Sequence, residues 1–170
     1  DRYLLNVNRE RFDTLGAEVV FNRRFGKTLF NRDTFYIIVG TDSGLLPGYI
    51  ARQGIPDGTR YLFVEPAGIL DHIRALSPEG RPADRMAYVT PEQCVEAAIG
   101  LSISDHIFID KLEILSSCAA EDMFWPEYRE AGLVVRQSVN RYVWEVKSSL
   151  GFEVFIRRQL ENLGENRVSA

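Results

Sequence analysis

The middle of the chain alternates short apolar runs with segments in which apolar residues recur every three or four positions. The apolar runs predict four buried strands, at residues 35–39, 61–64, 86–89 and 106–110. The periodic segments predict helices between them, at residues 44–53, 67–76 and 90–99. Buried strands separated by helices are typical of a mostly parallel sheet with helices on both faces. We therefore expect an α/β fold of the Rossmann-like (methyltransferase-like) kind.

Two flanking regions have different patterns. Residues 1–30 contain short β-like stretches, at 3–7 and 17–21, and predict a β-rich cap, whereas residues 31–115 form the predicted Rossmann-like core. Residues 116–170 predict a helical extension of two amphipathic helices that bend at Gly151. Their apolar stripes either pack on the sheet or contact a following domain or a second subunit. The three regions together are expected to form one structural domain.

Composition limits the classes of partner. The 170 residues are 45% hydrophobic and 26% charged, which suits one globular domain. A net charge of -4 gives no general attraction for nucleic acid or an anionic membrane, and we interpret Arg23, Arg24 and Lys27 as a solvated cluster. No apolar run approaches the length of a membrane span. We expect a soluble, cytoplasmic protein and, from the non-methionine start and polar end, a piece of a longer one.

Isolated reactive side chains carry little functional signal. Cys94 and Cys118 lack the spacing of a zinc site, so we expect buried free thiols and no metal. His72 and His106 have no nucleophile or ligand at a diagnostic spacing, and we expect surface or half-buried histidines. The aromatic cluster at residues 123–128 is expected to anchor a loop on the core, with stacking on a base or sugar as the alternative.

The turn after the first predicted strand contains most of the candidate ligand-binding residues: Gly40, Asp42, Ser43 and Gly44. A dinucleotide-binding turn needs a GxGxxG spacing, in which backbone N–H groups approach a pyrophosphate. Here Asp42 replaces the middle glycine and would direct negative charge toward a phosphate. This argues against NAD, FAD or a nucleoside triphosphate, and the two glycines are interpreted as permitting a tight strand-to-helix turn.

Two further acids are candidates at the ends of predicted strands. Glu65 stands where class I methyltransferases hold the ribose of S-adenosylmethionine, a cofactor that has no phosphate. Asp110 ends the predicted fourth strand, so Asp42, Glu65 and Asp110 are expected at the same edge of the sheet. Together they could hold a sugar or a cation, and the alternative is that they cap helices. No catalytic residue is assigned.

Four segments, at residues 37–44, 63–66, 140–144 and 159–163, resemble the N-terminal domain of the motility-associated-factor (Maf) flagellin glycosyltransferases. The resemblance implies a protein that transfers a nonulosonic, sialic-acid-like sugar from its CMP-activated form to serine or threonine of flagellin. In that family the transferase core follows this domain, so no family catalytic residue maps onto this chain. It implies an accessory domain without a cofactor, whose partners are flagellin, the transferase domain or a second copy. A class I methyltransferase and a protein-interaction module are the alternatives.

Overall fold

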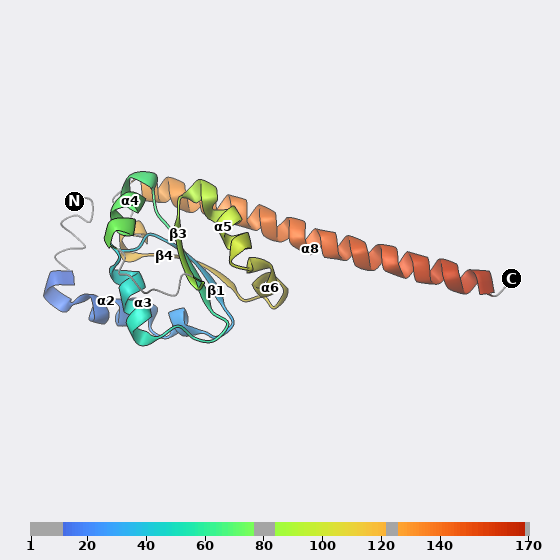
Figure 1. Ribbon diagram of the computed structural model, residues 1–170, viewed down its shortest axis with the longest axis horizontal. Coiled ribbons are helices and arrows are strands. Elements are labelled where there is room, and N and C mark those ends of the chain that lie inside the picture. Colours follow the sequence, from blue (N-terminus) through green and yellow to red (C-terminus); the bar gives the residue numbers. More distant parts are fainter. Residues whose placement is uncertain (1–11, 77–83, 122–125, 169–170) are drawn as a thin grey trace.

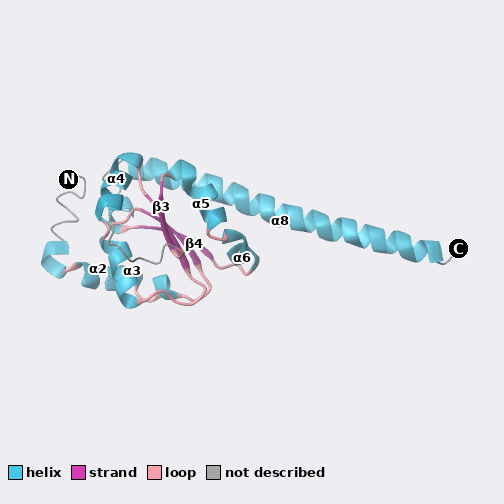
Figure 2. Ribbon diagram, viewed as in Figure 1, coloured by secondary structure: helices cyan, strands magenta, loops and turns pink. Residues whose placement is uncertain are grey.

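A single parallel sheet forms the centre of the molecule. The computed structural model describes residues 12–76, 84–121 and 126–168. The strands, in sheet order, are β3 (Met86–Val89), β2 (Arg60–Val64), β1 (Phe35–Val39) and β4 (Leu112–Ser116). All neighbouring strands are parallel, and Figure 2 shows them in the middle of the body with helices around them. The α/β fold is confirmed, and the order 3-2-1-4 is compatible with a Rossmann-like fold.

Helices cover both faces of this sheet. One face packs on α2 (Ala17–Phe25) and α3 (Leu45–Gln53) through Tyr36 and Ile38 of β1. The other face belongs to a core that includes residues of α4 (Ala67–Leu76), α5 (Cys94–Gly100), α6 (Ile103–Phe108) and α8 (Pro126–Val168). The other described elements include η1 (Thr28–Phe30), η2 (Pro91–Gln93) and α7 (Cys118–Glu121). Because β1 has a strand on each side and helices on both faces, all five of its residues are buried.

The N-terminal region differs from its prediction. Residues 17–21, predicted as a β segment, begin helix α2, and the described residues before β1 contain no strand. Val20, Phe21 and Phe25 are the buried residues of this helix. Their spacing places one apolar side against the sheet, so tertiary packing outweighs the β-branched composition. The predicted segment at residues 3–7 lies outside the described residues.

The fourth strand was predicted in the wrong place. Residues 106–110 are not a strand, because α6 runs through Phe108, and the strand that pairs with β1 is β4. Ile103, His106 and Ile107 are buried on one side of α6, whereas Phe108 and Ile109 are 51% and 54% exposed. This is helical periodicity, and a short apolar run alone does not distinguish it from a strand.

The C-terminal region is one continuous helix. Two helices with a bend at Gly151 were predicted, but α8 runs unbroken from Pro126 to Val168. Its first half packs on the sheet through residues that include Val135 and Val139, and its second half extends far from the body (Figure 1). Trp144 and Phe152 are 70% and 66% exposed. In the described residues, no helix is apolar and long enough to span a membrane.

Candidate functional site

The turn between β1 and α3 has an unusual backbone. Asp42, Ser43 and Gly44 follow one another with φ values of 47°, 61° and 77°, and Gly40 has φ 88°. The Gly44 N–H donates to the carbonyl oxygen and to the hydroxyl of Thr41, at 3.1 Å each. A left-handed conformation costs about 1–3 kcal/mol at a non-glycine residue, so surrounding contacts must hold Asp42 and Ser43 in place. These contacts involve the two acids of the turn region.

Glu65 follows β2 and is fully buried. Its Oε1 accepts hydrogen bonds from the backbone N–H and the hydroxyl of Thr41, both at 2.6 Å. Its Oε2 accepts the hydroxyl of Tyr128, from the start of α8, at 2.7 Å. Burial raises the pKa of Glu65 to about 7, although the donors from Thr41 and Tyr128 oppose the shift. Both carboxylate oxygens are therefore already bonded within the protein.

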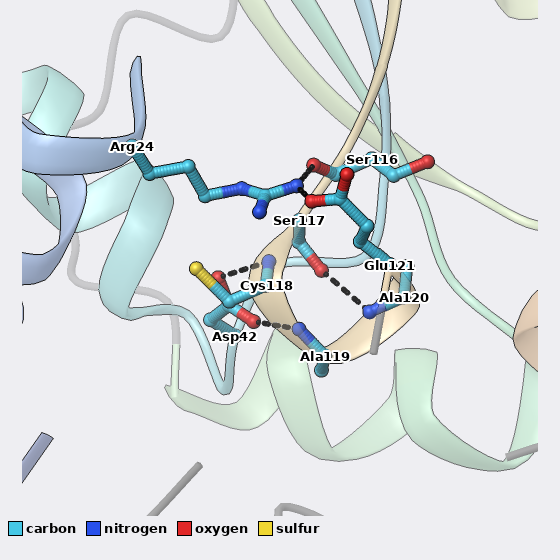
Figure 3. A network of polar contacts seen from close by, with 8 residues as sticks. All are labelled: Arg24, Asp42, Ser116, Ser117, Cys118, Ala119, Ala120 and Glu121. Atoms are coloured by element: carbon cyan, nitrogen blue, oxygen red, sulfur yellow. Dashed lines mark hydrogen bonds and ion pairs between the residues drawn. The ribbon is translucent and has the colours of Figure 1, made fainter. Parts of the chain in front are cut away.

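Asp42 is also fully buried, at the point where the ends of β1 and β4 meet. Its Oδ2 accepts the backbone N–H of Cys118 at 3.0 Å, and its Oδ1 accepts that of Ala119 at 2.8 Å (Figure 3). Burial raises the pKa of Asp42, while these two N–H donors favour its charged form. The interpretation of Asp42 as a helix cap is confirmed, since both donors belong to the first residues of α7.

A second layer of contacts connects α7 to α2. Arg24 forms an ion pair with Glu121 and donates to the carbonyl oxygen of Ser116 at 3.3 Å (Figure 3). Arg23 and Lys27 are exposed, as expected for a solvated cluster, but Arg24 is engaged with the end of β4. This contact positions the segment that supplies the two N–H donors to Asp42.

Gly40 is required by close packing. A Cβ at this position would lie 2.2 Å from Oγ of Ser117 and 3.4 Å from Cε1 of Tyr128. In a dinucleotide-binding turn, a missing side chain leaves room for the pyrophosphate. Here Ser117, which follows β4, and Tyr128, near the start of α8, face the same space. Gly44 differs, because nothing lies within 4 Å of its added Cβ, and its positive φ alone favours glycine.

Among the described residues, these contacts engage the acids at the place where open α/β sheets usually bind ligands. That place is the crevice beyond the carboxyl ends of the strands at which the strand order reverses, which here is between β1 and β4. Asp42 bridges it to α7, and Ser117 packs against the glycine that would form its floor. The fold and site thus define an α/β protein of Rossmann-like strand order in which the two crevice acids are occupied by donors from the chain itself.

Asp110 does not join the other two acids, which corrects the expected convergence. It precedes β4, so it lies at the amino edge of the parallel sheet, whereas Asp42 and Glu65 follow β1 and β2 at the carboxyl edge. The exposed Asp110 carboxylate pairs with Nζ of Lys147 at 2.8 Å. This lysine holds the pKa of Asp110 below its usual range. The misplaced strand at residues 106–110 was the cause of the error.

The histidines and cysteines have structural surroundings. His106 is buried, with Nε2 2.9 Å from the carbonyl oxygen of Gly58 and an edge contact to Phe35, while His72 is exposed. Cys94 and Cys118 are buried free cysteines, as predicted, and burial raises the pKa of Cys94 to about 12. The described residues contain no group of three or more possible metal-ligating side chains.

Three residues of this site were not identified from the sequence: Thr41, Ser117 and Tyr128. Thr41 lies inside the candidate turn, and its hydroxyl was a signal that could have been weighed. Tyr128 belongs to the aromatic cluster, and its burial agrees with the expected core anchoring, while residues 122–125 lie outside the described residues. Ser117 gave no signal, because the strand before it was not predicted.

Comparison of the chain with protein-family models, with curated proteins and with solved structures finds no match.

Proposed function

We propose that this chain is a non-catalytic accessory domain of a protein resembling the Maf flagellin glycosyltransferases. Two lines of reasoning support the proposal. The first is the similarity of residues 37–44, 63–66, 140–144 and 159–163 to the N-terminal domain of that family. The second is the pair of occupied crevice acids, which gives the domain a scaffolding role and leaves sugar transfer to another part of the protein.

The hydrogen bonding of Glu65 is the main observation that supports the proposal. A methyltransferase needs this carboxylate to accept the ribose hydroxyls of S-adenosylmethionine. Here Thr41 and Tyr128 donate to both of its oxygens in a buried environment. A nucleoside would have to displace these donors and leave the Tyr128 hydroxyl and the Thr41 N–H unpaired, at a cost of about 1–3 kcal/mol for each group. The same competition would oppose a CMP-activated sugar in this crevice.

The exposed half of α8 supports an accessory role in a larger assembly. Several large apolar side chains of α8 are exposed: Trp144, Leu150, Phe152, Val154 and Ile156. Exposed large apolar side chains that are concentrated on one projecting segment are compatible with a protein contact there. In the proposed function, this part of α8 contacts flagellin or the transferase domain.

Calorimetric titration with S-adenosylmethionine and with CMP tests the proposal. We expect neither to bind the wild-type chain more tightly than about 100 μM, which corresponds to about -5.5 kcal/mol. Tyr128→Phe is the informative variant, because it releases Oε2 of Glu65 without removing the aromatic ring. Binding of a nucleoside by Tyr128→Phe would indicate that the Tyr128 hydroxyl closes the crevice. Absence of binding by this variant would indicate that the crevice has no room for a nucleoside.

Binding of S-adenosylmethionine to the wild type below about 100 μM, weakened by Glu65→Gln, would support the methyltransferase alternative and contradict the proposal. Glu65→Gln is a suitable control because its amide oxygen can still accept from Thr41. Unchanged far-UV circular dichroism of both variants would show that the fold is retained.

A further inference from the structure

Within residues 12–76, 84–121 and 126–168, strand β4 has no neighbour on its outer edge. It lies at the end of the strand order, and β1 is its only strand partner among the described residues. The Phe35 N–H donates to the carbonyl oxygen of Lys111, and the Ser117 N–H donates to that of Val39, at 2.8 Å each. Backbone groups alternate in direction along a strand, so odd-numbered residues of β4 face β1. The N–H and C=O groups of Leu112, Ile114 and Ser116 therefore point away from the sheet.

A cavity of about 390 Å³ follows this edge near the end of β4. Its lining includes Ile114, Leu115 and Ser116 of the strand, with Arg24 from α2 and Arg136 from α8. The Arg24 guanidinium reaches the carbonyl oxygen of Ser116 at 3.3 Å. The open edge is thus bordered by Arg136 on one face of the sheet and, on the other face, by Arg24 in its ion pair with Glu121.

We infer that β4 is the pairing site for a second copy of this chain, in which two β4 strands meet antiparallel about Ile114. In that register Ile114 lies opposite its copy, and Leu112 lies opposite Ser116. These are the residues whose backbone groups point outward, so each opposed pair can exchange N–H to C=O bonds. The carbonyl oxygen of Ser116 already accepts from Arg24 and would use its second lone pair. The two sheets then continue into one another, and the interface is isologous.

Charge complementarity identifies a second copy as the occupant. Glu113 is exposed and has no ion-pair partner in the described part of the chain. It stands opposite Tyr36 in the pairing of β1 with β4, so it faces the side of the sheet that α2 covers. In the proposed register, Glu113 of one copy lies opposite Leu115 of the other, beside Arg24, which also pairs with Glu121 of its own copy. The twofold axis repeats this contact between an acid and an arginine.

Engineered thiols test the register directly. The natural Cys94 and Cys118 are buried, so an exposed cysteine is the reactive one. Opposed residues that exchange both hydrogen bonds have Cα atoms about 5.5 Å apart, which is within the range of a disulfide. We expect Ile114→Cys to form a covalent dimer under mild oxidation at about 100 μM, a concentration suited to a weak interface. A non-reducing gel measures the dimer, which is twice the monomer mass of 19.4 kDa.

Lys111→Cys is the matched control, on an exposed residue just before β4 that takes no part in the Glu113 to Arg24 contact. In the proposed register its two copies lie roughly 20 Å apart, beyond disulfide reach. We expect at least a tenfold lower yield of dimer than for Ile114→Cys, and a circular dichroism spectrum like that of the wild type for both variants. Salt should reduce the association, because it screens the Glu113 to Arg24 contact.

Three results would overturn the inference. One is no covalent dimer from Ile114→Cys, and another is equal yields from the two variants, which would indicate random collision. The third is efficient crosslinking of Phe152→Cys without crosslinking of Ile114→Cys, which would move self-association to α8. None of these readouts involves nucleotide binding, so the inference and the proposed accessory function fail independently.

Discussion

Glu65 combines burial with three hydrogen-bond donors, and this combination gives stability a specific pH dependence. The ordinary pKa of 4.5 is raised to about 7 in the folded protein, chiefly by burial. Between these values the folded state holds a proton that the unfolded state has lost, so stability falls as pH rises from about 4.5 to about 7. The full difference corresponds to about 3 kcal/mol. The raised pKa of Asp42 acts in the same direction.

We therefore expect the free energy of unfolding to be higher at pH 5 than at pH 8. Glu65→Gln mimics the protonated acid and should remove much of this difference, so the variant becomes more stable than wild type above pH 7. Urea denaturation at a series of pH values measures the free energy of unfolding of the wild type and of Glu65→Gln. Stability that rises over this interval in the wild type would contradict the assignment.

Gly40 and Gly44 are both in a positive φ conformation but differ in their surroundings, which makes them a matched pair. Gly40→Ala adds the strain of a positive φ and a clash with Ser117, whereas Gly44→Ala adds only the strain. We expect Gly44→Ala to cost about 1 kcal/mol and Gly40→Ala to cost at least about 3 kcal/mol, measured by chemical denaturation. Equal losses would show that the contact between Gly40 and Ser117 does not constrain the fold.

At the residue level, contacts between residues close in the sequence could be predicted, whereas contacts between residues far apart in the sequence could not. The helix predicted at residues 90–99 does begin there, as η2 followed by α5, with a capping box between Thr90 and Gln93. Asp42 was recognised as a possible cap, but its donors come from Cys118 and Ala119. No pattern in a single sequence indicates which residues meet across such a separation.

At the level of elements, long-range context decided the cases that the sequence left ambiguous. The strands β1, β2 and β3 were predicted because each is a continuous apolar run bounded by turn residues. The segment at residues 106–110 has a similar run, yet it belongs partly to α6, because only one side of it is buried. Strand β4 contains Glu113 and is half exposed at the sheet edge, so its apolar signal is weaker.

Helix α8 shows a different limit of sequence patterns. Two amphipathic segments that meet at Gly151 predicted a bend at this glycine. Nothing lies within 4 Å of a Cβ added at Gly151, and the helix continues through it. Without a packing partner at this position, the glycine lowers helix propensity by about 1 kcal/mol but does not break the hydrogen-bonded ladder.

The molecule as a whole consists of a packed body and a projecting helix (Figure 1). The described contacts of α8 with the body extend to Val146, and Lys147 adds an ion pair with Asp110. Beyond this point the described apolar side chains are exposed, including Phe152 and Ile156. The stability of the body should therefore be independent of the projecting part, whose apolar surface is available for contacts.

A chain that ends at Leu150 tests this division. We expect its melting temperature to stay within about 3 °C of the full chain, since about 1 kcal/mol shifts it by 2–4 °C in proteins near this size. A chain that ends at Ser138 is the control, because it removes the buried Val139 and the partly buried Val143 and Val146. That truncation should lose more than about 3 kcal/mol and melt far lower or fail to fold. Differential scanning calorimetry at low protein concentration, where self-association is negligible, measures both. A large loss for the chain ending at Leu150 would mean that the projecting half of α8 stabilises the body, and its exposed side chains could then not be assigned to partner contacts alone.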